Sequence, residues 1–410
     1  MTAQQLVFIS LEPWDHVWRR NQFLCRELAG RGWEVLFIEP ASDWSSGLRR
    51  ADWSEFRRHE AWSPAGLPSV RVMRPVKVMP RSSTTGRRVN ARLLRKQVQR
   101  ALRRLGWVRP RLWINDHDTW ALAAAGDWER VVYDVTDDWA RGFDDGPTRR
   151  RIEAADRQLC GIADDVIVCS ARLCELREPH ARRVHLIPNG VDVAAYRDVP
   201  GPGETPPRSR VWRRPVLGYT GTLHPERLSL KLIVKLAKQW DGTVVLLGPN
   251  HLGDATQPLR SHPNVDVVDA VPYGELPMWM RAMDVMIVPH RVTEFTESLN
   301  PLKLWEYLAA GKPVVSTPVA GFRDFPQHVR LPETPAQFIG ACQQAAGEDD
   351  PARVAARQAE ALGHDWSRRA EAAEAVLLGR ADGPADADAD RGPSAAPLGV
   401  DDAVGALSDA

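Results

Sequence analysis

The 410-residue sequence has few cysteines, no surplus of charge of one sign and no long apolar run. Its five cysteines are odd in number and contain no Cys-x-x-Cys pair, which argues against a disulfide framework. Lys and Arg total 54 against 53 Asp and Glu, so no nucleic-acid partner is expected. No basic stretch precedes the short apolar run at the N-terminus, as it would in a signal peptide. No segment is apolar for the roughly 20 residues that span a bilayer, so we expect a cytoplasmic protein.

The order of apolar segments predicts two domains of the α/β class. The chain is 43% hydrophobic and long enough for two cores. Strand-length apolar runs alternate with helical patterns in both halves, which predicts two doubly wound, Rossmann-like parallel sheets facing a cleft. The boundaries that we expect are an N-terminal domain over 1–198, a Pro/Gly-rich linker over 199–214, a C-terminal domain over 215–380 and a disordered acidic tail over 381–410.

Strand and helix limits follow from the same patterns. In the C-terminal half we expect a helix over Leu228–Gln239 and another over Leu302–Ala310. The strands expected there are Val216–Tyr219, Thr243–Leu247, Val265–Val268, Val285–Pro289 and Pro313–Ser316. No predicted strand is followed by Gly-x-Gly-x-x-Gly, which argues against a dinucleotide oxidoreductase.

The segment 71–111 is strongly basic. It contains 14 Lys and Arg residues, and no acidic residue occurs between Arg71 and Asp116. Apolar residues at helical spacing within it predict that one helix face packs on the sheet. The basic face has two interpretations. It is either an ordinary solvated surface, or a patch for anionic lipid headgroups at the inner face of the membrane or for a phosphorylated acceptor.

The window 297–322 predicts a helix whose N-terminus points at a ligand. Asn300–Pro301 is a helix-start signal, and free N–H groups at such an end suit a diphosphate. Lys303 lies in the first turn, where a positive charge opposes the helix dipole unless an anion binds. Glu306 lies one turn further on. It is either a ribose-binding carboxylate or an exposed partner of Lys303 on the helix surface.

Longer blocks of sequence resemble GT-B glycosyltransferases, most of all the retaining enzymes of glycosyltransferase family 4. The C-terminal blocks are NVDVVDAVPYGELPMWMRAMDVMIVPHR and NPLKLWEYLAAGKPVVSTPVAGF. The N-terminal ones are PWDHVWRRNQ (Pro13–Gln22), YDVTDDW (Tyr133–Trp139), ADDVIVCSARL (Ala163–Leu173) and IPNGVD (Ile187–Asp192). The resemblance covers roughly residues 6 to 379 in order, and the segment HDWSRRAEAAEAVL is similar to the terminal helix that crosses back to the first domain.

The resemblance implies a donor site in the C-terminal domain. Glu306 corresponds to the second carboxylate of the family's Glu-x7-Glu motif, while the first falls on Ser298, one residue after Glu297. Thr222 stands where a phosphate-binding Arg is common, and Arg227 takes the place of the usual Lys. A solvated helix face is the alternative for Arg227 and for Lys231. The donor contacts we expect are Glu306, Asn300, Leu302, Thr222, Lys231, Val271 and Ser298.

Three residues are candidates for the chemistry itself. Arg227 and Lys303 would neutralise the leaving diphosphate, and Asp137 lies in the YDVTDDW block of the first domain. Electrostatic stabilisation of this kind needs no metal and no cofactor, with the nucleotide-diphosphate sugar as co-substrate. Retention, implied by the family, involves front-face attack by an acceptor.

Acceptor recognition is expected in the first domain. The loop LEPWDHVW replaces the usual glycine-rich turn after the first strand. Asp15, His16, Arg20 and Asp138 lie at or near predicted strand ends, and for His16 we favour a structural or acceptor-positioning role over catalysis.

The acceptor itself is left open by the sequence. A glycan, a lipid-linked precursor and a secondary-metabolite aglycone all remain candidates. A nucleotide-sugar 2-epimerase and a non-catalytic GT-B subunit are the alternative functions.

Overall fold

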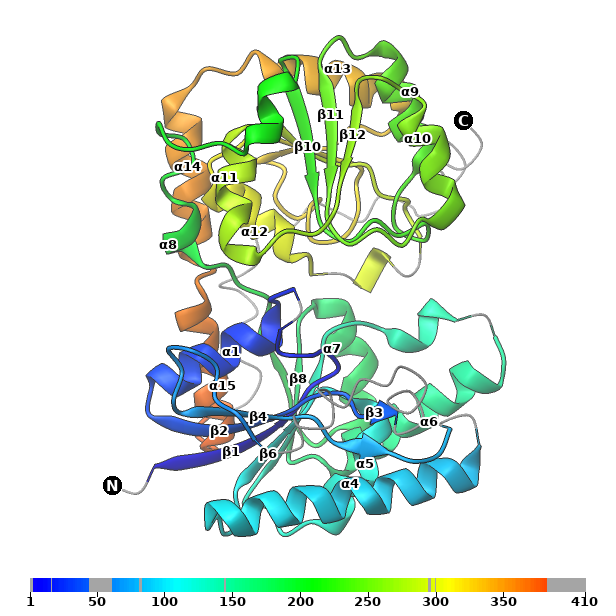
Figure 1. Ribbon diagram of the computed structural model, residues 1–410, viewed down its shortest axis with the longest axis vertical. Helices are drawn as coiled ribbons and strands as arrows, with labels where there is room; N and C mark the ends of the chain where they lie inside the picture. Colours follow the sequence, from blue (N-terminus) through cyan, green and yellow to red (C-terminus); the bar gives the residue numbers. More distant parts are fainter. Residues whose placement is uncertain are drawn as a thin grey trace. The chain divides into compact units, whose positions relative to one another are not determined.

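The computed structural model describes residues 3–15, 17–43, 61–80, 83–143, 145–293, 296–298 and 300–381 (Figure 1). His16, the side chain of Ser298 and the tail beyond 381 lie outside this description. The chain forms two compact units. One contains the residues up to Pro188 together with the described residues from Arg369 onward, and the other contains Asn189–Arg368. The segment 199–214, for which a linker was predicted, belongs to the second unit and contains the short helix η4, Pro207–Val211.

The first unit is built on a seven-stranded parallel sheet in the order β4-β2-β1-β6-β7-β8-β9. Its strands are β1 Gln4–Ile9, β2 Trp33–Ile38, β4 Val70–Met73, β6 Arg111–Ile114, β7 Val131–Val135, β8 Asp165–Val168 and β9 Val184–Leu186. They are almost wholly buried, as expected of a parallel sheet covered on both faces. Two further strands, β3 Ser42–Asp43 and β5 Val76–Lys77, pair with each other in a separate two-stranded parallel sheet.

Helices cover both faces of this sheet. The cluster packed on one face includes residues of α4 Thr84–Leu105, α5 Trp120–Ala125, α6 Pro147–Ile162 and α7 Ala171–Arg177. On the other face, α1 Arg20–Gly30 packs against β2. The last helix, α15 Trp366–Leu377, lies next to α1 (Figure 1). Glu374 of α15 bonds Arg31 and the indole of Trp33 at 2.7 and 2.8 Å, which fixes α15 to this unit.

The second unit repeats the design with a six-stranded parallel sheet in the order β12-β11-β10-β13-β14-β15. Its strands are β10 Val216–Thr220, β11 Thr243–Leu247, β12 Val265–Val268, β13 Val285–Val288, β14 Val314–Ser316 and β15 Val329–Arg330. One face packs on α9 Leu230–Gln239, α10 Gln257–Arg260 and α13 Pro335–Ala346, and the other on α8 Val193–Tyr196, α11 Leu276–Arg281, α12 Leu302–Ala309 and α14 Pro351–Leu362 (Figure 1).

The expected doubly wound α/β class is therefore confirmed, with two parallel sheets of Rossmann-like order. Helix α4 occupies the basic segment. Ser83 caps its start by accepting a hydrogen bond from the N–H of Gly86, and Gly106 ends it in the left-handed conformation at φ 69°. Val98 and Ala101 are buried, so the apolar stripe packs on the unit as predicted. None of the described helices is both long and apolar enough to cross a membrane.

Candidate functional site

The second sheet reverses its strand order between β10 and β13. β11 and β12 continue from β10 in one direction, while β14 and β15 continue from β13 in the other. At such a point the two connections diverge and leave a crevice beyond the carboxyl ends of the strands, where ligands bind in this class of fold. The segments there are Gly221–Thr222 after β10 and Pro289–His290 after β13. These loops, together with the start of α12, form the candidate donor site.

Lys303 reaches this point from the first turn of α12. Its Nζ donates a hydrogen bond of 2.7 Å to the hydroxyl of Tyr219, the fourth residue of β10, and lies 4.2 Å from the centre of the same ring. Gly221 makes room for it, because a Cβ there would lie 2.9 Å from Nζ, and its φ of 135° also disfavours other residues. The ammonium group is thereby held beside the backbone at the end of β10.

Tyr219 is itself held on its far side. Its Oη lies 3.2 Å from Nε2 of His290 and 3.2 Å from the carbonyl oxygen of Thr222. Burial, with the positive charges of Lys303 and Arg227 beside it, lowers the pKa of His290 well below its ordinary value, so the imidazole is neutral at pH 7. Burial also raises the pKa of Tyr219 far above its ordinary range, so the phenol stays protonated. Tyr219 and His290 are buried, and Lys303 is partly buried. We call these three hydrogen-bonded residues the Lys303 relay.

Arg227 adds a second positive charge to this site. It lies in the turn before α9, is partly buried, and its charge acts on both Tyr219 and His290. The turn is anchored because the carbonyl oxygen of Arg227 accepts a hydrogen bond of 2.8 Å from the N–H of Arg291. Two cations therefore converge on the carboxyl ends of β10 and β13, as a bound diphosphate requires.

Glu306, one turn after Lys303, is partly buried. Burial raises the pKa of Glu306 to about 7, and Lys303 and the Tyr196 hydroxyl act in the opposite direction. The alternative of an exposed surface carboxylate is therefore wrong, because the hydration that keeps a surface carboxylate strongly acidic is lost here. Contact of Glu306 with a ribose diol stays a prediction.

Hydrogen bonds lock α12 in place. The Tyr307 hydroxyl accepts a hydrogen bond of 3.0 Å from the N–H of Thr220 at the end of β10. Before the helix, the Asn300 side chain accepts one of 2.8 Å from the N–H of Asn189, and the Asn189 amide donates one of 2.6 Å back to the Asn300 carbonyl oxygen. Asn300, one of the predicted donor contacts, thus fixes the approach to the helix.

The other predicted donor residues are spread around this site. Thr222 follows β10, Leu302 begins α12, and Val271 packs against the core after β12, all three partly buried. Lys231 lies exposed in the first turn of α9. The residue before Ser298, Glu297, forms an ion pair of 2.6 Å with Arg323. Contacts of these residues with a donor stay predictions.

In the first unit, Arg20 is buried where an acceptor contact was predicted. Only 3% of its surface is exposed. Its Nε bonds Asp134 at 2.9 Å, and Nη1 donates to the carbonyl oxygens of Ile187 and Pro188. The ion pair joins α1 to β7, and the two hydrogen bonds join it to the segment after β9, which gives Arg20 a structural role. Asp15 is exposed in the loop after β1, and its contact with an acceptor stays a prediction.

Asp137 and Asp138 line a hollow of about 190 Å³ after β7. Asp138 is buried and lies 3.7 Å from Arg177, which also pairs with Asp156 at 3.0 Å. Asp137 is partly buried. The hollow is polar, so it suits a hydroxyl-rich ligand, and roles of both residues toward an acceptor or in catalysis stay predictions. Within the described ranges, no three His, Cys, Asp or Glu side chains are gathered as a metal site would need.

Tyr219 and His290 were not predicted from the sequence. Tyr219 occurs inside an apolar strand and His290 directly after another, so each fits an ordinary buried position. The two are 71 residues apart, and only the pairing of β10 with β13 brings them together. A polar residue at the carboxyl end of each of two adjacent strands was the available signal.

Both halves of the chain match families of known proteins. Residues 17–195 match the family described as Glycosyltransferase Family 4, and residues 214–347 match Glycosyl transferases group 1. TuaH of Bacillus subtilis (strain 168), a protein assigned to teichuronic acid biosynthesis as a glycosyltransferase, is 31% identical over 271 residues, which is 60% of this chain and 66% of that protein. The chain therefore matches slightly less than two thirds of this relative's length.

Two solved structures share the fold at low sequence identity. A sucrose-phosphate synthase from Thermosynechococcus elongatus superposes with a TM-score of 0.68 at 16% identity, over 92% of this chain and 98% of its own. HepE of Anabaena in complex with UDP-glucose superposes with a TM-score of 0.60 at 17% identity, over 92% of this chain and 99% of its own. The resemblance inferred from the sequence blocks is confirmed. The chain belongs to the glycosyltransferases of group 1 and family 4, with the GT-B fold.

Proposed function

We propose that the protein transfers a sugar from a nucleotide-diphosphate sugar to a glycan or lipid-linked acceptor of cell-envelope polysaccharide assembly, with retention of configuration. The observation that carries this proposal is the Lys303 relay beside Arg227, at the point where the strand order of the second sheet reverses. The similarity to TuaH supports the class of acceptor. The five cysteines form no disulfide, which supports a reducing, cytoplasmic site of action.

The donor would lie with its diphosphate at the start of α12. Lys303 and Arg227 supply positive charge there, and the first turn of α12 supplies free N–H groups. Glu306 would accept hydrogen bonds from the ribose hydroxyls. We take a UDP-sugar as the first donor to test, because HepE, with the same fold, was solved with UDP-glucose.

The chemical step follows from this charge distribution. The bond between the sugar's anomeric carbon and the diphosphate oxygen breaks, and negative charge develops on that oxygen. The acceptor hydroxyl attacks from the same face, and its proton passes to the leaving diphosphate. Lys303 and Arg227 stabilise the developing charge, an effect for which removal of one donor costs on the order of 100-fold in rate in comparable sites. The step uses no protein base and no metal.

Tyr219 would act as a positioning residue. Lys303 has a long flexible side chain, and its hydrogen bond to the buried Tyr219 hydroxyl fixes one rotamer before the donor arrives. Because neutral His290 lies on the other side of that hydroxyl, the phenol proton can point away from Lys303. The Lys303 ammonium group is therefore held in one position and keeps its positive charge.

A donor screen with product analysis tests the proposal. Saturation-transfer NMR across UDP-, GDP- and dTDP-sugars should show binding of one nucleotide class. With lipid-linked oligosaccharide fractions as acceptors, that donor should release its nucleoside diphosphate only when acceptor is added. Interconversion of the sugar without acceptor would instead show a 2-epimerase, and absence of binding by every donor would refute the assigned site.

A further inference from the structure

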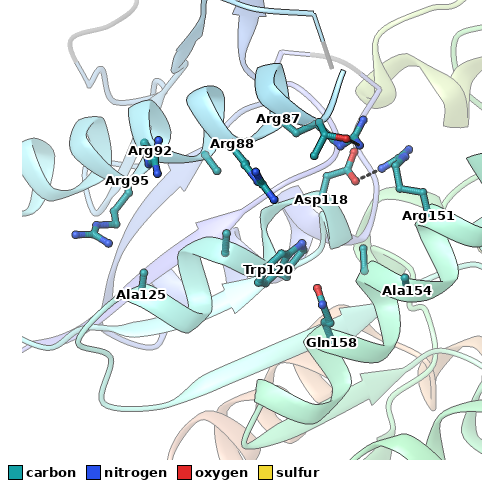
Figure 2. A pocket seen from close by; sticks show the side chains of 14 residues that line it. Arg87, Arg88, Arg92, Arg95, Asp118, Trp120, Ala125, Arg151, Ala154 and Gln158 are labelled. Atoms are coloured by element: carbon teal, nitrogen blue, oxygen red, sulfur yellow. Dashed lines mark hydrogen bonds and ion pairs between the residues drawn. The ribbon is translucent and has the colours of Figure 1, made fainter. Parts of the chain in front are cut away.

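A groove rich in arginine lies between α4, α5 and α6 of the first unit, and none of its lining residues is one assigned to the acceptor or the donor. It has a volume of about 590 Å³, within the range of small-ligand sites. Five arginines line it, Arg87, Arg88, Arg92, Arg95 and Arg151, with Asp118 as the one acidic lining residue (Figure 2). We call it the arginine groove.

Most of this positive charge is not neutralised by the lining. Arg151 forms an ion pair with Asp118, and Arg87 donates a hydrogen bond of 3.0 Å to Thr84. Arg88, Arg92 and Arg95 are exposed, and among the described residues no carboxylate lies within ion-pair distance of them. Their spacing of four and three residues places them on successive turns of one face of α4. Three guanidinium groups thus form a row along the groove.

Part of the groove lining is apolar. Ala91, Ala154 and Ala155 are among the residues that line it. The partly buried Trp120 lies in the middle of the groove (Figure 2). A small hydrated anion would use the arginines and leave this surface wet. An anionic group joined to an apolar segment would use both, because the apolar part covers the alanines and the indole ring.

The surrounding helix points to a membrane as the source of such a ligand. α4 carries eight basic residues and no acidic one in its 22 residues, while its opposite face packs on the sheet. Clusters of four to eight Lys and Arg on an amphipathic helix are typical of binding to anionic lipid. Exposed arginines also match phosphate with two parallel hydrogen bonds, which lysines do not.

We propose that the arginine groove binds the headgroup phosphate of an anionic membrane phospholipid. Arg88, Arg92 and Arg95 hold the phosphate, and the glycerol with the first part of an acyl chain lies along the alanines and Trp120. The groove thereby places the first unit on a lipid surface. This inference does not rest on the donor site, so vesicle binding and donor binding can fail separately.

Vesicle flotation of the full chain tests the proposal. The probes are vesicles of phosphatidylcholine alone and vesicles of phosphatidylcholine with phosphatidylglycerol. The groove variant is R88Q/R92Q/R95Q. The matched control is K96Q/R100Q/R104Q, which removes the same charge from exposed positions of the same helix outside the groove. Circular dichroism and donor binding establish that both variants are folded.

The unmodified chain should float with anionic vesicles and not with neutral ones. The groove variant should bind on the order of 100-fold more weakly, since each arginine at such a surface is worth roughly five-fold in affinity. The affinity of the control variant for anionic vesicles should fall by a factor at least ten times smaller than the factor for the groove variant. The reason is that charges outside the groove lie further from the bound phosphate and are screened. R92Q alone should lose roughly five-fold.

Three results would overturn the proposal. The first is equal binding to neutral and anionic vesicles. The second is a fold-loss of vesicle affinity in the groove variant that is less than ten times the fold-loss in the control variant. That result would assign binding to the general charge of α4. The third is binding of soluble glycerol 3-phosphate that the groove variant loses, with no flotation of the unmodified chain on anionic vesicles, which would assign the groove to a free phosphate compound.

Discussion

Replacing Glu306 by glutamine is expected to stabilise the protein at high pH and to change little at low pH. Burial raises the pKa of Glu306 from 4.5 to about 7 in the folded chain. A carboxyl whose folded pKa is raised contributes stability while it is protonated, and that contribution is lost as the pH rises from its unfolded pKa through its folded pKa. Glutamine keeps the shape of the neutral form and never ionises.

The size of the effect follows from the pKa shift. A shift from 4.5 to about 7 corresponds to about 3 kcal/mol of unfolding free energy at full ionisation. Partial exposure of the side chain reduces this, so we expect Glu306→Gln to gain about 2 kcal/mol near pH 8 and less than about 1 kcal/mol near pH 5.

Urea unfolding followed by tryptophan fluorescence at both pH values measures the difference between variant and parent. The comparison cancels every other titrating group. Glu275→Gln, at an exposed position of the same unit, is the control and should show no such pH dependence. A gain for Glu306→Gln that is equal at the two pH values, or a loss near pH 8, would refute the inference that burial of this carboxyl outweighs its stabilisation by Lys303 and Tyr196.

Three further substitutions test separate parts of the account. Arg227→Ala should weaken UDP-sugar binding about 10- to 100-fold by calorimetry, the worth of one charge-assisted hydrogen bond, and unchanged affinity would remove Arg227 from the site. Tyr219→Phe keeps the ring beneath Lys303 but removes the hydroxyl, so kcat/KM for the donor should fall about 10-fold with little change in unfolding free energy, whereas an unchanged kcat/KM would exclude the positioning role. Arg20→Leu should cost about 3–5 kcal/mol in urea unfolding because it leaves Asp134 buried without its partner, and a loss below about 1 kcal/mol would contradict the buried ion pair.

Strands of the second unit could be predicted closely because they are short, continuous apolar runs. Thr243–Leu247 and Val265–Val268 have the limits expected from the sequence. Helix α9 begins at Leu230 rather than at Leu228, because Ser229 caps it and Leu228 forms an antiparallel bridge with His290. That bridge is a contact between distant residues, which a local pattern does not contain.

The strand Val70–Met73 was not predicted at all. It is short and directly followed by Arg74–Pro75, so it was included in the basic segment. Its pairing with β2 supplies the burial that its own sequence does not signal. Short edge strands of this kind are defined by their neighbours more than by their residues.

The donor helix could be predicted, while its surroundings could not. The helix-start signal and Lys303 were visible in one window of sequence, but the sequence left two alternatives for Glu306. Burial by the rest of the unit excludes the exposed alternative, and the ribose contact stays a prediction. Tyr219 and His290 lie on different strands, so only the order of the sheet reveals that they meet beside Lys303.

Calorimetric titration with UDP-glucose tests the central claim most directly, namely that the Lys303 relay forms the phosphate end of a nucleotide-sugar site. The titration compares the unmodified chain with Lys303→Gln and with Lys235→Gln, the same substitution at an exposed position of α9. The account predicts binding to the unmodified chain and to Lys235→Gln, and about 10- to 100-fold weaker binding to Lys303→Gln. Equal affinity of the two variants would contradict it.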